Sequence, residues 1–216
     1  MLLRQEVIMT EKILEAIKEL REKSKKRNFL QTFDLIINLK EFDTKKPENK
    51  INEDFILPYG KGEEAKVVIF SDTIKEAKAE ILRSSDLEKL AKDKRSLRKL
   101  VKNTDFFLAE PQLMPLIGKI LGQFLAPKGK MPKIISGDVE KMVENYKKSV
   151  KIRIKDSPVV QCTVGKENMK DEEIAQNVQA IINFLKERLP KGSKNIKEVL
   201  LKLTMSKPVK IEVKKW

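Results

Sequence analysis

Apolar residues in the first third of the chain recur with the periods of helices and half-buried strands. Between residues 11 and 23 they lie at offsets 0, 3, 4 and 7, which predicts an amphipathic helix. Residues 32–39 alternate instead, which predicts a strand with one buried face. One side of that strand carries Phe33, Leu35, Ile37 and Leu39, and the other carries Thr32, Asp34, Ile36 and Asn38. Residues 51–57 predict a second strand, and Pro58, Gly60 and Gly62 then interrupt the pattern at a predicted hinge.

The segment from residue 66 to residue 148 follows a different pattern, in which short, wholly apolar runs alternate with helical periods. The runs are residues 67–70, 81–82 and 105–109, and helices are expected at 74–79, 85–101, 115–124 and 139–148. Thr73 and Glu76 have the spacing of a capping box for the first of these helices. Continuous apolar strands are typical of sheets covered on both faces, and their alternation with helices predicts a parallel sheet with right-handed crossovers.

The last third of the chain returns to the first pattern. Strands are expected at residues 150–154 and 159–164, an amphipathic helix at 171–188, and a terminal strand pair at 199–203 and 209–213. Because the two ends share a pattern that the middle lacks, the sequence predicts one domain inserted into another. We expect a discontinuous α+β terminal domain of residues 1–65 plus 149–216, and an inserted, Rossmann-like α/β domain with a parallel sheet, residues 66–148.

The charge of the chain points to a polyanionic partner. Lys and Arg number 46 against 32 Asp and Glu, which gives a formal net charge of +14 and favours nucleic acid. No continuous apolar run approaches the ~20 residues that span a membrane, and the apolar pieces at the N-terminus are too short for a signal peptide. A single cysteine, Cys162, excludes an internal disulfide and fits a reducing, cytoplasmic setting.

The residue types present also restrict the chemistry. Without histidine there is no imidazole for a metal or a nucleophile, and one thiol cannot build a cysteine-rich zinc site, so we expect no metal and no cofactor. The segment Phe70–Ile74, where a doubly wound domain would bind phosphate, has no glycine and carries a carboxylate, Asp72. We expect no enzyme, but the sequence leaves open two alternatives. One is a nucleotide- or sugar-phosphate-binding enzyme built on the middle domain, and the other is a general nucleic-acid-coating protein.

A basic loop at residues 125–133 is the most distinctive segment. Its sequence, Leu-Ala-Pro-Lys-Gly-Lys-Met-Pro-Lys, places Lys128, Lys130 and Lys133 around prolines and a glycine that constrain the backbone. Such a loop holds its ammonium groups apart, either for contact with phosphates or simply in water.

Two further segments carry candidate contact residues for RNA. Phe29 shares its parity with Phe33, so core packing is the alternative interpretation of its ring. Thr32 and Asp34 project from the opposite face, where they are placed to hydrogen-bond ribose hydroxyls or base donors. The turn at residues 202–208 offers Thr204, Met205 and Ser206, which suit a sugar-phosphate edge, although a plain hairpin turn gives the same pattern.

Three separated motifs resemble the L-one family of large-subunit ribosomal proteins, in its archaeal form. They are residues 28–33 (Asn-Phe-Leu-Gln-Thr-Phe), the loop at 125–133, and residues 203–205 (Leu-Thr-Met). Residues 105–109 and 113–118 are also similar to archaeal members, and the match runs in order from about residue 11 to residue 213. Residues 1–8 have no clear counterpart.

The resemblance implies a cytoplasmic, two-domain rRNA-binding protein that is monomeric outside the ribosome. It implies a mobile stalk near the exit-site tRNA, and repression of translation through binding of the protein's own mRNA. The terminal domain is expected to carry the specific contacts. Carried over to this sequence, the rRNA-binding positions are Phe29, Thr32, Asp34, Thr204, Met205 and Ser206. To these we add Gln161, Thr163 and Lys166, on the neighbouring strand and its end. Lys128, Lys130 and Lys133 are expected to be secondary.

The chain departs from the family pattern at two places. Ser206 stands where the family's turn usually ends in glycine, and Ala126 and Lys128 stand where glycine and arginine are usual. Glycine permits a positive φ that serine disfavours. If this turn needs such a conformation, Ser206 weakens rRNA binding by roughly 1 kcal/mol relative to glycine.

Overall fold

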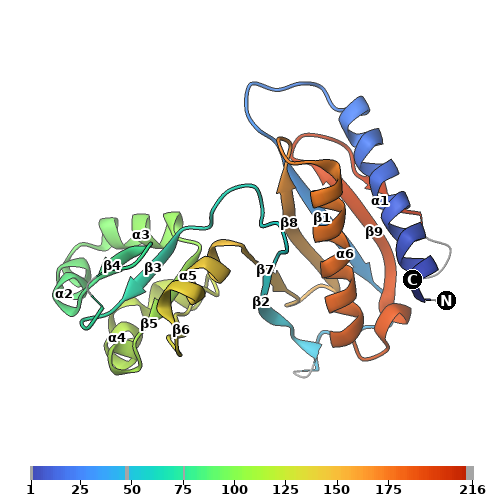
Figure 1. Ribbon diagram of the computed structural model, residues 1–216. Helices are drawn as coiled ribbons and strands as arrows, with labels where there is room; N and C mark the ends of the chain where they lie inside the picture. Colours follow the sequence, from blue (N-terminus) through green and yellow to red (C-terminus); the bar gives the residue numbers. More distant parts are fainter. Residues whose placement is uncertain (1, 47–48, 75, 213–216) are drawn as a thin grey trace. The chain divides into compact units, whose positions relative to one another are not determined.

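The computed structural model describes residues 2–46, 49–74 and 76–212, and it separates into two compact units (Figure 1). The terminal unit combines the chain up to Glu63 with the chain from Lys148 onward. The inserted unit is Glu64–Lys147. The model thus has a mixed α+β fold in which a parallel α/β sheet interrupts an antiparallel one, as the sequence predicted.

The terminal unit is built on an antiparallel sheet of order β10-β9-β1-β8. Its strands are β1 (Thr32–Leu39), β8 (Val159–Lys166), β9 (Ile196–Leu203) and β10 (Val209–Lys210), and a separate ribbon pairs β2 (Asn52–Ile56) with β7 (Ser149–Arg153). Helices α1 (Leu2–Lys23) and α6 (Asp171–Arg188) pack on one face of the four-stranded sheet (Figure 1). Alternate residues of β1 are buried under these helices, so the other set faces away from them.

The inserted unit has a parallel sheet of order β4-β3-β5-β6 with helices on both faces. Its strands are β3 (Val67–Phe70), β4 (Glu80–Leu82), β5 (Phe106–Ala109) and β6 (Lys133–Ile134). Its helices are α2 (Ser84–Lys92), α3 (Lys94–Asn103), α4 (Met114–Leu125) and α5 (Val139–Lys147), and short 3₁₀ turns lie at Pro111–Leu113 here and Gly192–Asn195 in the terminal unit. All residues of β3 and β5 are buried, as their unbroken apolar sequence predicted.

Two local predictions in the inserted unit are wrong, and one element was missed. The described residues of the segment 74–79 form no helix, because the hydroxyl of Thr73 donates to the Glu110 carboxylate instead of capping a helix. The helical stretch at 85–101 is two helices, since the Asp93 carboxylate accepts the backbone N–H groups of Arg95 and Ser96 and starts α3. The two-residue strand β6 at the end of the basic loop was not predicted.

The first helix is longer than its pattern indicated. It begins at Leu2 rather than near residue 11, so the stretch without a family counterpart continues the helix. Helix α6 has the predicted bounds, Asp171–Arg188.

Candidate RNA interface

The open face of the terminal sheet brings together most of the candidate residues. On neighbouring strands β1 and β8, Asp34 lies opposite Thr163, and Thr32 lies opposite Lys166. Gln161 follows along the same strand, opposite Ile36. Because residues two apart on a strand share a face, this register creates a polar strip from residues that are over 120 positions apart in sequence.

A pair of threonines fixes the turn after β9 to the start of β1. The hydroxyl of Thr204 accepts the backbone N–H of Thr32 at 2.9 Å. The two threonine hydroxyls are also 2.9 Å apart. Thr204 therefore positions the turn that contains Met205, and both hydroxyls lie at the exposed end of the sheet.

Gln31 is a further positioning residue, which the sequence reasoning did not single out. Its side chain is buried with only 1% of the residue exposed, and its amide oxygen accepts the backbone N–H of Met205 at 3.2 Å. Its amide nitrogen donates to the hydroxyl of Ser24 at 3.2 Å. The sequence did contain a signal for this role. Gln31 lies two residues before the buried Phe33 and so faces inward with it, and a buried amide needs hydrogen-bond partners.

The strain expected at Ser206 is absent. Among the described residues other than glycine, only Glu41 has a positive φ, so serine meets no steric penalty in this turn. The Ser206 hydroxyl instead accepts the backbone N–H of Leu203 at 2.8 Å and lies 3.0 Å from the carbonyl oxygen of Lys207. Serine closes the turn through its hydroxyl, so backbone strain gives no reason for weaker binding, and the effect of Ser206 on rRNA affinity stays a prediction.

Two of the candidate residues next to the polar strip in sequence, Phe29 and Met205, are large, apolar and exposed. Phe29 is 51% exposed and Met205 is 60% exposed, although the parity of Phe29 had allowed a core position. An exposed ring beside hydroxyls and a carboxylate suits the stacking of unpaired bases.

The carboxylate of Asp34 is held in an unfavourable environment. Partial burial raises its pKa above the usual 3.8, against the lowering effects of a hydrogen bond from Thr163 (3.3 Å) and of the charge of Lys202. Lys166, at the far end of the strip, forms an ion pair with Glu63. Burial also raises the pKa of Cys162 to about 12, so the thiol stays protonated and unreactive.

Comparison with known proteins decides the family. Residues 20–207 match the model of the ribosomal protein L1p/L10e family. The chain belongs to this family. It is 43% identical over 212 residues to a protein of Methanocaldococcus jannaschii, covering 95% of this chain and 97% of that one. It is 40% identical to a protein of Pyrococcus horikoshii, with 94% and 96% covered, and 39% identical to one of Methanobrevibacter smithii, with 94% and 100% covered. All three relatives are described as large ribosomal subunit protein uL1.

A basic groove of about 790 Å³ lies beside the turn of this L1-family protein. Helix α1 and the segment that follows it form one wall, and residues 205–210 form the other. Its lining includes the cations Lys25, Arg27 and Lys207, and also the carboxylates of Glu15, Glu19 and Glu212. Met205, Ser206 and Lys207 line the groove, so its cations lie beside the turn.

The three lysines of the basic loop are not equivalent. Lys130 points inward, donating to the carbonyl oxygens of Val101 (3.1 Å) and Thr104 at the end of α3. Its charge stabilises the negative end of that helix. Lys128 and Lys133 are exposed, so these two are the ones placed to meet a phosphate.

The predicted hinge segment is held against the terminal unit. Gly60 and Gly62 have φ values of +67° and +79°, which explains the choice of glycine. The buried side chain of Asn177 donates to the carbonyl oxygens of Gly60 and Val164, each at 2.8 Å. It also accepts the backbone N–H of Tyr59 at 3.1 Å. A hinge role for Pro58, Gly60 and Gly62 stays a prediction.

The L1 family is a family of ribosomal proteins, not of enzymes, and the inserted sheet has no obvious phosphate site. Its carboxyl edge, where open α/β sheets bind ligands, is occupied by the Glu110 carboxylate. This group accepts the hydroxyls of Ser71 (2.5 Å) and Thr73, so those donors are already engaged. Within the described chain, no cluster of three or more Asp, Glu or Cys is arranged for a metal ion, and no helix is long and apolar enough to span a membrane.

Proposed function

We propose that this protein binds large-subunit rRNA as a structural component of the ribosome, through the open face of the terminal sheet. The observation that carries the proposal is the joining of two distant segments by the Thr32–Thr204 pair. That pair places the exposed Met205 turn beside the strip that contains Asp34 and Thr163. Membership of a ribosomal protein family also supports a role in binding rRNA.

The proposed mechanism divides recognition between three kinds of group. Threonine hydroxyls and the Asp34 carboxylate hydrogen-bond 2′-hydroxyls or base amino groups, because a carboxylate accepts such donors but repels phosphate. Phe29 and Met205 cover bases or ribose with exposed apolar surface. Lysines and arginines of the adjoining groove neutralise phosphates without reading sequence.

The decisive experiment compares one rRNA fragment with an unrelated RNA across a salt series. We expect a strong preference for the fragment in the wild type, and a loss of that preference in Thr204→Val, which cannot accept the Thr32 N–H. Thr204→Ser keeps the hydroxyl and should retain most of the preference. Lys128→Glu, on the inserted unit, should affect fragment binding less than Thr204→Val. Equal affinity of the wild type for both RNAs would refute the proposal and favour a general coating protein.

We further propose that the same face binds a site of similar structure in the protein's own mRNA, and so represses translation. Membership of the ribosomal protein L1p/L10e family supports this, and the proposal implies that one set of contacts serves both RNAs. Competition is the test: the rRNA fragment should displace the mRNA leader, and Thr204→Val should release repression in a coupled translation assay. Simultaneous binding of both RNAs would contradict it.

The inserted unit is proposed to swing as a mobile stalk near the exit-site tRNA. Two chain crossings connect the units, near residues 63–64 and 147–148, and two short connections allow relative motion. Single-molecule distance measurements between labels on the two units should give a broad or multi-state distribution. A single narrow distance in the free protein would refute the mobility.

A further inference from the structure

Helix α3 of the inserted unit carries a dense cluster of exposed positive charge. Its ten residues contain five exposed cations and no acidic residue. They are Lys94, Arg95, Arg98, Lys99 and Lys102. At about 100° per residue they fall within an arc of about 140°, away from the buried Leu97 and Val101 that attach the helix to the core.

None of these cations forms an ion pair within 4.0 Å among the described residues, although the charge of Arg95 acts on the neighbouring Asp93 carboxylate. Nearby lysines of the same unit do form ion pairs: Lys89 pairs with Asp86, Lys78 with Glu144, and Lys147 with Glu64. The carboxylate of Asp93, which precedes α3, is engaged in capping the helix. Like charges spaced four residues apart repel each other along α3, which disfavours the helix. Such an arrangement is expected where an external polyanion supplies the missing negative charge.

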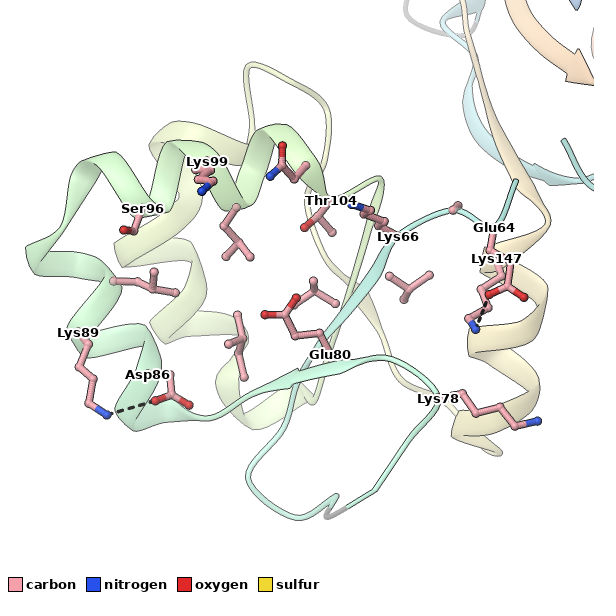
Figure 2. A pocket seen from close by; sticks show the side chains of 17 residues that line it. Glu64, Lys66, Lys78, Glu80, Asp86, Lys89, Ser96, Lys99, Thr104 and Lys147 are labelled. Carbon is pink, nitrogen blue, oxygen red and sulfur yellow. Dashed lines mark hydrogen bonds and ion pairs between the residues drawn. The ribbon is translucent and has the colours of Figure 1, made fainter. Parts of the chain in front are cut away.

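The groove next to α3 is less suited to bind a polyanion than the outer face of the helix. It has a volume of about 790 Å³ and lies between α3, α2 and the edge of the sheet. Figure 2 shows Lys99 at its rim, with Glu80 in its middle and ion pairs at Lys89 and Lys147. A phosphate inside would meet the Glu80 carboxylate, whereas the outer face of α3 presents cations alone.

We propose that the exposed face of α3 is a second RNA-binding surface, which contacts the phosphate backbone of an RNA other than the one on the terminal sheet. The cations extend over about 12 Å of helix axis, comparable to three or four phosphates of one nucleic-acid strand at about 3.4 Å each. The surface has no exposed aromatic or amide group along the cationic arc, so it reads shape and charge rather than sequence. The helix is rigidly held, because Lys130 caps its carboxyl end.

The test uses the full-length protein already saturated with the rRNA fragment. The probe is an RNA hairpin of unrelated sequence, titrated at several salt concentrations. The variant combines Arg95→Gln, Arg98→Gln and Lys102→Gln. The matched control removes the same net charge from three dispersed, exposed lysines, Lys18→Gln, Lys40→Gln and Lys119→Gln.

We expect the fragment-bound wild type to bind the hairpin, and the α3 variant to lose most of that binding while the control keeps it. The slope of log affinity against log salt should become less steep by about 2, because each lost phosphate contact removes about 0.7–0.9. The melting temperature of the α3 variant should be unchanged or higher, since repulsion along the helix is relieved. Equal loss in variant and control, or no hairpin binding by the wild type at low salt, would overturn the proposal. Affinity for the rRNA fragment is measured separately, so failure of this surface is distinguishable from failure of the terminal one.

Discussion

Replacement of Asn177 by leucine tests how the chain leaves the terminal unit. The Asn177 side chain is fully buried and bonds three backbone groups of two segments, those of Tyr59 and Gly60 and that of Val164 in β8. Leucine has the same number and branching of side-chain heavy atoms but no polar atom. The substitution therefore leaves two carbonyl oxygens and one N–H without this partner.

The expected cost follows from how well water can replace the lost bonds. Gly60 and Val164 are buried, so each carbonyl loses about 1–1.5 kcal/mol. Tyr59 is 47% exposed, so water can reach its N–H and little is lost there. Burial of the additional apolar carbon atoms of leucine offsets part of the lost free energy. We expect the free energy of unfolding of the terminal unit to fall by about 2–3 kcal/mol.

Hydrogen exchange measured by mass spectrometry resolves the two units. Amides of residues 57–62 and of β8 should exchange faster in Asn177→Leu, whereas those of the inserted unit should not change. Asn103→Leu, at an exposed position of the inserted unit, is the control and should shift stability by less than about 0.5 kcal/mol. If residues 58–62 already exchange freely in the wild type, and Asn177→Leu changes nothing, the segment is a free hinge and the reasoning fails.

Three further substitutions test individual contacts. Ser206→Gly removes the hydroxyl that accepts the Leu203 N–H; rRNA-fragment affinity in a filter-binding assay should fall by about three- to fivefold, for about 1 kcal/mol, and tighter binding would restore the strain argument. Asp34→Asn should stabilise the protein at pH 7 in thermal melts. Burial raises the pKa of Asp34, so the contribution of this carboxyl to stability is present below about pH 4 and is lost as the pH rises through the folded-state pKa. The gain from asparagine should accordingly vanish near pH 3, and a lower melting temperature at pH 7 would contradict the assignment. Lys130→Met removes the donor to the carbonyl oxygens of Val101 in α3 and of Thr104, which follows the helix. Urea denaturation should show a loss of about 1–2 kcal/mol with fragment affinity unchanged, whereas Lys128→Met should alter neither.

Periodicity in the sequence was sufficient for the elements that contribute a regular face to the core. Strand β1 was predicted with its observed bounds, and its buried set is the set that alternation indicated. The unbroken apolar runs gave β3 and β5 as strands covered on both faces. These predictions succeed because burial repeats at the period of the element itself, so neighbours in sequence carry the information.

Features that depend on distant partners were not predictable in this way. The segment after β3 has the sequence pattern of a capped helix. In the structure, however, the Thr73 hydroxyl donates to the carboxylate of Glu110, 37 positions further along the chain. The Gln31 side chain accepts the backbone N–H of Met205, 174 residues later. The Ser206 hydroxyl accepts the backbone N–H of Leu203, whereas comparison with the family's glycine alone had suggested backbone strain at this position. In each case a polar side chain selects its partner through the tertiary fold, which no local period records.

Two surfaces of this protein retain charged groups that reduce its own stability. Burial disfavours ionisation of Asp34, and α3 holds five cations against one another, none of which forms an ion pair among the described residues. Selection for stability alone would remove both, since asparagine and glutamine fit these positions. Locally unfavourable choices that persist are expected at functional sites. The two surfaces lie on different units, so neutralising one should weaken one RNA contact and leave the other intact. A protein neutralised at both should be at least as stable as the wild type and bind both RNAs more weakly.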